Sequence, residues 1–322
     1  MGHPEPPPGY SLRAATRADL PAVVAMLRVC DIEDWGEVDT IEEQLAFEWE
    51  LSDMDLSRDV WLIHAADGAL AGYTWILGRD GHQRLDGWGA VHPEHRGRGL
   101  GDHLMRLRAH LDEVHAALAA PDAPVRSYFG MVGPDRGAHE LADRYGWHEV
   151  RHFWQMSRDL SPTEVLPVPR RPDGVTIRGF EQGRDERAVH AAFQESFSEH
   201  WGHVYMPFED WAKRMELEWF DPSLWWVAES GGDLAGALAG AELEGDGWVM
   251  TLGVRTPWRA RGIGEALLWT SFEAFRARGL AVVKLDVDAG NETGATRLYE
   301  RVGMRAIRQY DDSERIIREG AV

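Results

Sequence analysis

Apolar positions along the chain follow two periods in a fixed order. In residues 20–27 they recur at three- and four-residue spacing, which predicts an amphipathic helix. Two strand-like segments follow, 60–66 and 69–77, and the Asp67-Gly68 pair between them indicates a hairpin. A further strand ends at Val91, and it is followed by a glycine-rich turn and another helix. This order predicts a sheet with helices packed on it.

The same order of elements returns in the second half of the chain. Segments 224–230 and 234–243 again read as a hairpin, joined by Gly231-Gly232-Asp233. Positions that recur at an offset of about 165 residues are Arg13 and Arg178, Trp35 and Trp201, and Val91 and Val254. A nearly constant offset over the whole chain indicates duplication of one fold. We therefore expect an α/β (α+β) protein with two tandem copies, each a mixed, mostly antiparallel sheet flanked by helices.

A proline-rich segment separates the two copies. Residues 161–174 hold four prolines and no periodic apolar pattern. Such segments act as semi-rigid spacers. The sequence therefore predicts an N-terminal domain at 9–160, a linker at 161–174 and a C-terminal domain at 175–322.

Composition narrows the class of protein. The formal net charge of −20 argues against a partner built of nucleic acid, and an acidic field concentrates small cations such as amines. Cys30 is the single cysteine, no run approaches the ~20 apolar residues of a membrane helix, and the N-terminus has no secretory signal pattern. We expect a cytoplasmic protein, a monomer or a homodimer, with no membrane partner.

The turn after Val91 and Val254 carries the chemistry. Both copies contain Arg-x-x-Gly-x-Gly leading into a helix, at 96–101 and 259–264. The first turn of a helix presents unpaired amide groups and a positive dipole end, and glycine lets backbone approach an anion closely. Arginine adds charge-assisted hydrogen bonds. These features favour a diphosphate-binding turn, and the spacing is not that of a Rossmann fingerprint.

At these residues the sequence resembles the GNAT superfamily of N-acetyltransferases, and its tandem layout is similar to that of mycothiol synthase-like proteins. The resemblance implies acetyl-CoA as cofactor. It places the diphosphate on the turn and the pantetheine arm on the strand before it. The residues implied in the second copy are Leu252, Gly253, Val254, Arg259, Ala260, Arg261, Gly262, Ile263 and Gly264. Those in the first copy are Val91, Arg96, Gly97, Arg98, Gly99, Leu100 and Gly101.

A second motif distinguishes the copies. Residues 291–304 resemble the family pattern N-x-x-x-A-x-x-L-Y-x-x-x-G, which implies that Tyr299 protonates the leaving thiolate and that Asn291 and Ala295 help hold the cofactor. The first copy has Ala142 and Pro134 at the positions of Tyr299 and Asn291. Alanine cannot donate a proton. We therefore expect catalysis in the C-terminal domain, with a degenerate N-terminal domain that retains the turn.

An amine acceptor must lose a proton before it attacks, and several side chains are candidates for the base. They are Glu199, His200, Glu244 and Asp246, with Glu242 nearby, while Trp201, His203 and Tyr205 are candidates for lining the acceptor site. The resemblance to mycothiol synthases implies a glutamate on the fourth strand, where this chain has Trp248. The spacing of the histidines and acids does not match a zinc motif, so no metal is expected.

The sequence thus predicts an N-acetyltransferase that transfers an acetyl group to the amine of a small molecule by direct attack in a ternary complex. One alternative within the same chemistry is mycothiol synthase, which acetylates a cysteinyl amino-sugar. Another is a non-catalytic CoA-binding regulatory protein with two degenerate modules.

Overall fold

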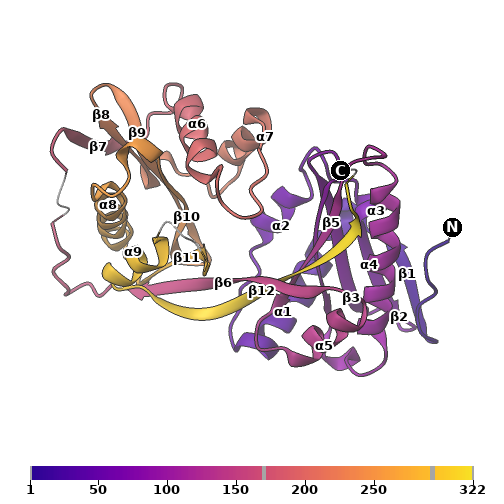
Figure 1. Ribbon diagram of the computed structural model, residues 1–322. Coiled ribbons are helices and arrows are strands. Elements are labelled where there is room, and N and C mark those ends of the chain that lie inside the picture. Colours follow the sequence, from indigo (N-terminus) through magenta and orange to yellow (C-terminus); the bar gives the residue numbers. More distant parts are fainter. Residues whose placement is uncertain (1, 169–171, 291–293, 321–322) are drawn as a thin grey trace. The chain divides into compact units, whose positions relative to one another are not determined.

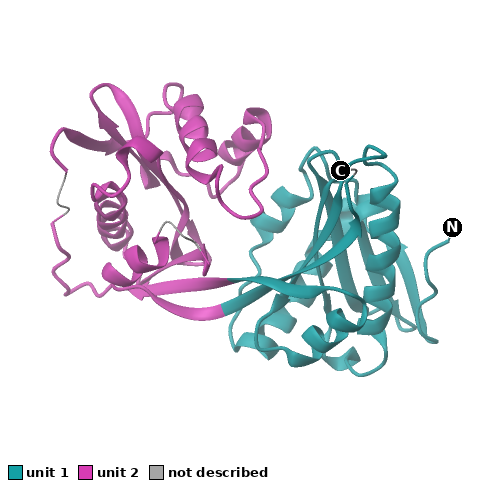
Figure 2. Cartoon of the chain, viewed as in Figure 1, with its two compact units in different colours: residues 1–152, 309–322 teal, residues 153–308 magenta. Residues whose placement is uncertain are grey.

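A computed structural model describes residues 2–168, 172–290 and 294–320. The chain forms two compact units (Figure 2). Unit 1 consists of residues 1–152 and 309–322, and unit 2 consists of residues 153–308. Each unit is described by itself.

In unit 1 the neighbouring strands of the sheet follow the order β1-β2-β3-β4-β5-β12. Its strands are β1 (Tyr10–Ala14), β2 (Val60–Ala65), β3 (Leu70–Arg79), β4 (Arg84–Val91), β5 (Val125–Val132) and the greater part of β12 (Arg305–Arg318). Its helices are α1 (Leu20–Trp35), α2 (Glu42–Glu48), α3 (Leu56–Asp59), α4 (Leu100–Ala116) and α5 (Arg136–Arg144), with short 3-10 turns η1 (Arg17–Asp19) and η2 (Pro93–His95).

Helices cover both faces of this sheet, and strand β2 shows why. Val60 and Leu62 belong to the apolar cluster with α1, whereas Trp61 joins the cluster with α4 and Ile63 the one around Leu100 and Leu104 of α4. Successive side chains of a strand point to opposite faces, so a strand that is apolar at every position must be buried on both.

Unit 2 repeats the plan with the order β7-β8-β9-β10-β11-β6 (Figure 1). Its strands are β7 (Val175–Gly179), β8 (Trp225–Ser230), β9 (Asp233–Leu243), β10 (Asp246–Val254), β11 (Val282–Asp288) and the second part of β6 (His148–Asp159). Its helices are α6 (Glu186–Phe197), α7 (Phe208–Ala212), α8 (Ile263–Ala277) and α9 (Ala295–Arg301), with 3-10 turns η3 (Lys213–Glu216), η4 (Pro222–Leu224) and η5 (Thr256–Trp258). One continuous apolar cluster forms its core.

The two units exchange their last strands. Strand β6 leaves the N-terminal part of the chain and pairs antiparallel with β11 over residues 153–159. Strand β12, at the end of the chain, pairs antiparallel with β5 of unit 1. The compact units therefore divide the chain at 152/153 and 308/309, which differs from the predicted division at the proline-rich segment.

The predicted architecture is confirmed. Each copy is a mostly antiparallel sheet flanked by helices, and strands β4 and β10 end at the predicted Val91 and Val254. None of the described helices is both long and apolar enough to cross a membrane.

Candidate functional site

In each unit one pair of neighbouring strands is parallel and separates after two residues. In unit 2, β10 and β11 pair only at Gly247 with Val283 and at Trp248 with Lys284. A bulge between Val249 and Thr251 then interrupts the pairing of β10 with β9. Bulges bend the strand that carries them. The backbone edges of β10 and β11 that face each other beyond this point are thus left open.

A cavity of about 530 Å³ is lined by both of these strands. Residues 249–254 of β10 and 285–288 of β11 line it, together with the turn around 258–265 and parts of α9. Side chains from the segment 193–214, which spans α6 to η3, complete the lining. The size and the mixture of apolar walls with a few polar groups are typical of small-molecule sites.

The glycine-rich turn at the cavity has the same backbone in both copies. Ala260 and Gly262 have φ of +58° and +85°, and Gly97 and Gly99 at the matching positions have +74° and +82°. Left-handed residues at alternate positions of a turn aim backbone N–H groups inward, which creates an anion-binding concavity. Helices α8 and α4 begin directly after Gly262 and Gly99, so their positive ends add to it.

The first arginine of each turn is bound within the protein. Arg259 Nε donates to Val254 O at 3.1 Å and Nη2 donates to Ser196 O at 2.9 Å. Arg96 Nε donates to Val91 O at 3.2 Å, and its two Nη atoms bind both Asp34 oxygens at 2.7 and 2.8 Å. These two guanidinium groups therefore brace the turn, and its backbone N–H groups remain for an anion.

The second arginine and the last glycine of the motif differ in their surroundings, the arginine being exposed and the glycine packed against a helix. Arg261 and Arg98 are exposed and have no ion pair among the described residues. A Cβ added at Gly264 would lie 3.1 Å from Leu298 Cδ2, so this glycine allows α8 to pack closely on α9. Gly101 stands in the same relation to Leu141 on α5, at 3.0 Å.

Tyr299 lies on α9 and lines the cavity. Its ring is buried, its hydroxyl has no hydrogen-bond partner among the described residues, and burial raises the pKa of the phenol to about 12. The phenol therefore stays protonated and is free to donate to a ligand. Ala295 also lines the cavity, whereas Asn291 lies outside the described residues.

Two of the candidate acceptor-side residues also line the cavity, His200 and His203. Burial lowers the pKa of both, and for His200 the charge of Arg259 adds to the effect. Both imidazoles are therefore neutral at pH 7 and able to accept a proton.

The remaining candidates lie elsewhere in unit 2. Glu199 is exposed and 3.4 Å from Arg259, Glu244 is exposed in the β9–β10 turn, and Asp246 is paired with Lys284 at 2.8 Å. Trp201 contacts the Phe153 ring and Tyr205 is 63% exposed. None of these five is among the cavity-lining residues.

In unit 1 an arginine fills the place where the parallel strands part. Strands β4 and β5 pair only at Arg84 with Arg126 and Leu85 with Ser127. Arg108 Nη2 then donates to Leu85 O at 2.8 Å and to Tyr128 O at 3.0 Å, and thus bridges the two strands.

The same position on α8 is Ser271, because the helices α4 and α8 begin at Leu100 and Ile263. Ser271 is small and donates to Leu268 O of its own helix. Ala142, at the position of Tyr299, is buried in an apolar cluster of unit 1. The copies thus share the turn and differ in the gap between the strands.

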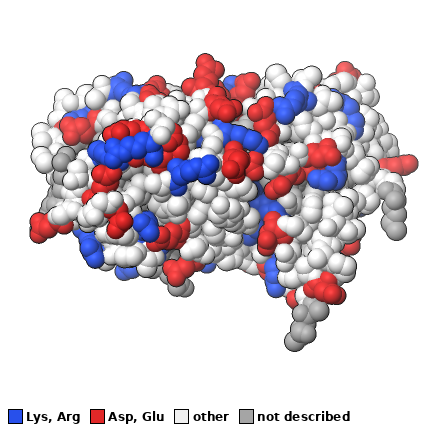
Figure 3. Space-filling view, turned by 90° about the horizontal axis from the view of Figure 1, so that it is seen from above, with Lys and Arg blue, Asp and Glu red and all other residues white. Residues whose placement is uncertain are grey.

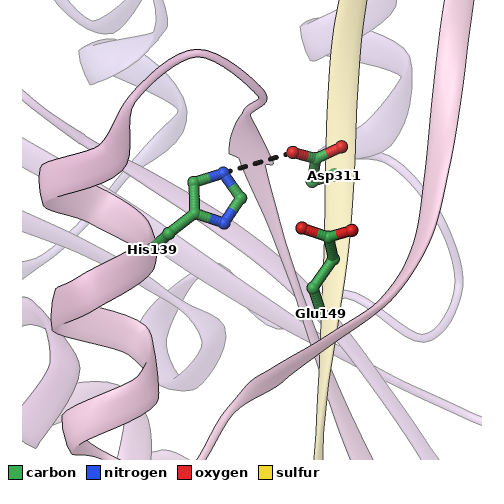
Figure 4. Close-up of side chains that lie close together, drawn as sticks. All are labelled: His139, Glu149 and Asp311. Atoms are coloured by element: carbon green, nitrogen blue, oxygen red, sulfur yellow. Dashed lines mark ion pairs between the residues drawn. The ribbon is translucent and has the colours of Figure 1, made fainter.

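One cluster in unit 1 has the composition of a metal site. His139, Glu149 and Asp311 project toward one another from α5, β6 and β12, with one possible ligand atom of each within 4.8 Å of the others (Figure 4). His139 Nε2 lies 3.2 Å from Asp311 Oδ2, and Gln309 donates to the other Asp311 oxygen at 2.7 Å. These contacts account for the burial of Asp311 without an ion.

The surface gives no indication of a nucleic-acid site on the face drawn in Figure 3. Acidic and basic side chains alternate there, and no basic stripe of the kind that follows a phosphate backbone is present on that face.

Comparisons with known proteins agree with this geometry. The profile of the family described as "Acetyltransferase (GNAT) family" matches residues 21–118 and 187–304. The chain is 36% identical over 241 residues to the mycothiol acetyltransferase of Thermobispora bispora, covering 73% of this chain and 76% of that protein. It is 32% identical over 295 residues to that of Geodermatophilus obscurus, covering 89% and 91%.

Solved structures give the same fold. A GCN5-related N-acetyltransferase from Sphaerobacter thermophilus has a TM-score of 0.82 at 35% identity and covers 98% of both chains. A tandem GNAT protein from the clavulanic acid biosynthesis pathway has a TM-score of 0.71 at 15% identity, over 97% of this chain and 100% of that one.

Proposed function

We propose, from the premise that the chain belongs to the acetyltransferase (GNAT) family, that unit 2 transfers an acetyl group from acetyl-CoA to the amine of a small molecule. The observation that carries the proposal is the cavity between β10 and β11, because it joins an anion-binding turn to a buried phenol and two neutral imidazoles. Members of this family are enzymes that transfer acetyl groups, and the proposal concerns which part of this chain does so and with which residues.

The cofactor fits the open strand edges. Residues 252–254 line the cavity, and an extended pantetheine arm can bond to free backbone groups of this segment as an added strand does. The backbone N–H groups of the 259–264 turn then hold the diphosphate, with exposed Arg261 beside them.

The reaction needs one proton accepted and one donated. His200 and His203 line the cavity in their neutral form, so either can take the proton of the acceptor amine, directly or through water. Tyr299 donates a hydrogen bond to the sulfur as the thiolate leaves. The thioester is already activated, and direct attack in a ternary complex needs no covalent enzyme intermediate.

Unit 1 takes a structural part in this proposal. Its turn has the same backbone, but Arg108 occupies the gap that the pantetheine arm would enter, and Ala142 replaces the phenol. We infer that unit 1 supports the fold through β12 and does not carry out chemistry.

Calorimetry with CoA tests the proposal through a matched pair of variants. Gly262→Asp and Gly99→Asp place a carboxylate at equivalent positions with φ of +85° and +82°, so the backbone strain is the same. We expect one CoA per chain, no binding in Gly262→Asp and unchanged binding in Gly99→Asp, with folding of each checked by circular dichroism. The opposite result would place the cofactor in unit 1.

A second candidate is acetylation of the cysteinyl amino-sugar precursor of mycothiol, because the relatives that are 32–36% identical carry the name mycothiol acetyltransferase. Trp248, at the position where that resemblance implies a glutamate, is buried beside Lys284. Turnover of that precursor against other amines decides between the two.

A further inference from the structure

Among the described residues, one cavity-lining cation has no counter-ion. Arg214 lies on η3 and lines the cavity together with Trp211, Met206 and Phe193. Its Nη2 donates only to Met206 Sδ, at 3.7 Å, and its charged carbon lies 5.4 Å from the centre of the Trp211 ring. Its Nε is buried without a partner, and among the described residues no carboxylate lies within 4.0 Å of it.

Three other arginines of unit 2 are paired with acids. Arg178 binds Asp185 at 2.6 Å, Arg255 binds Glu195 at 2.6 Å, and Arg278 binds Asp221 at 2.6 Å. A buried charge without a partner destabilises the folded state, because protein atoms replace its water without a compensating ion. Burial lowers the pKa of Arg214 to about 10, which still leaves it protonated at neutral pH. Among the described residues, the protein thus keeps a partly buried cation without a paired acid in the wall of this cavity.

Arg214 and the predicted cofactor groups come from different elements of unit 2. It comes from the 193–214 wall, which α6, α7 and η3 provide, whereas the anion-binding turn precedes α8. The bracing arginine of that turn is Arg259, so the phosphate side of the cavity has its own cation.

We propose that the acceptor carries an oxyanion, a carboxylate or a phosphate, that binds the guanidinium of Arg214 while its amine is directed to His200, His203 and the thioester. This inference rests on the proposed function and specifies its substrate class. A planar guanidinium offers paired donors that match carboxylate and phosphate oxygens. The aromatic and thioether walls formed by Trp211, Phe193 and Met206 suit a compact apolar or sugar body between the two ends.

Two pairs of probes test the charge. The first is L-phenylalanine against L-phenylalaninamide, and the second is glucosamine 6-phosphate against glucosamine. Release of free CoA is measured at saturating acetyl-CoA for the wild-type protein, for Arg214→Met and Arg214→Lys, and for the control Arg187→Met. Arg187 is exposed, stacks on the Phe208 ring at 4.1 Å and is not in the cavity lining.

We expect at least one anionic probe to exceed its uncharged partner by at least about 10-fold in kcat/KM, a preference lost in Arg214→Met, partly kept in Arg214→Lys and fully kept in Arg187→Met. Which pair shows it distinguishes a carboxylate from a phosphate. We also expect Arg214→Met to unfold at a higher temperature than the wild type, because an apolar side chain of similar length removes a partly buried charge that has no paired acid among the described residues.

Equal rates within both pairs, or a preference that survives Arg214→Met, overturns the inference. So does a protein that binds CoA but neither acetylates nor binds the anionic probes, and in that case the proposed function still stands. If the wild-type protein does not bind CoA, the proposed function itself is refuted. A lower unfolding temperature in Arg214→Met would show that Arg214 stabilises the fold and is not held for a ligand.

Discussion

Replacing Tyr299 by phenylalanine tests whether its hydroxyl contributes to catalysis or to the stability of the fold. The ring is buried and packs in the core of unit 2, and phenylalanine keeps that packing. The hydroxyl has no partner among the described residues, so its removal breaks no hydrogen bond of the folded chain. We therefore expect the free energy of unfolding to change by less than about 0.5 kcal/mol.

The expected kinetic loss is much larger. General acid catalysis contributes about 10²–10⁴-fold, which corresponds to about 3–5 kcal/mol of transition-state stabilisation. Hydrogen bonding to the cofactor in the ground state contributes less, so we expect kcat to fall by at least about 10-fold while the affinity for CoA changes little.

Tyr145→Phe provides the matched control. Its hydroxyl donates to Asp102 at 2.8 Å in unit 1, so the variant loses a hydrogen bond that contributes about 0.5–1 kcal/mol. We expect lower stability and unchanged turnover there, the reverse of Tyr299→Phe. The assay is single-turnover release of CoA with urea unfolding in parallel. Unchanged single-turnover rates in Tyr299→Phe would remove this side chain from the proposed role, and a large stability loss would make it a structural residue.

Three further predictions concern titration and backbone strain. The acidic limb of the kcat/KM profile is expected below pH 6.5, since burial lowers the pKa of His200 and His203. Replacing the histidine that acts as the base, by His200→Gln or His203→Gln, should abolish this limb and most of the activity. A limb above pH 6.5 would exclude both histidines as the base. Ala260→Gly should raise the free energy of unfolding by up to about 1 kcal/mol, because the residue has φ of +58°; urea unfolding measures this, and a loss of stability would contradict it. Burial also lowers the pKa of His82, so the stability it contributes is present above pH 6.5 and is lost as pH falls; thermal unfolding between pH 7.5 and 5.5 should show a smaller decrease in His82→Gln than in the wild type.

Local patterns predicted what short-range physics decides. Alternation and hairpin signals located β2, β3, β8 and β9, and the Val91 and Val254 positions marked the ends of β4 and β10. The Arg-x-x-Gly-x-Gly spacing predicted the two helix-starting turns, because left-handed backbone at Gly99 and Gly262 is a property of the local sequence.

The exchange of strands could not be read in the same way. Strand β12 pairs with β5 far along the chain: Tyr310 pairs with Val132, 178 residues away, and Glu314 with Tyr128, 186 residues away. The apolar pattern of a strand does not determine which other strand it pairs with, so the sequence predicted a domain boundary at the proline-rich segment. A fragment that begins at residue 175 lacks β6 and leaves one edge of β11 without its partner.

The sequence identified the site residues that belong to short motifs and missed those whose role depends on tertiary contacts. Glycines and the aromatic Tyr299 belong to short motifs, whereas Arg214 and Arg108 acquire their significance from burial. Charged side chains in the sequence usually indicate surface, and only the structure shows that Arg214 lacks an acid and that Arg108 bridges two strands. The motif predicted phosphate contacts for Arg96 and Arg259, which stays a prediction, and it did not reveal that both side chains also bond within the protein.

The two gaps between parallel strands lead to a final prediction. In unit 1 the carbonyls of Leu85 and Tyr128 accept hydrogen bonds from Arg108, so the divergence of β4 and β5 is satisfied from within. In unit 2 the facing edges of residues 249–254 and 285–288 border the cavity. A ligand at 100 times its dissociation constant stabilises the state that binds it by about 2.7 kcal/mol, and that stabilisation falls on the elements it touches. Hydrogen exchange with and without CoA should therefore show slower exchange in β10 and β11, with no change in β4 and β5. Equal protection of both pairs of strands would mean that Arg108 yields its place, and that unit 1 holds a cofactor as well.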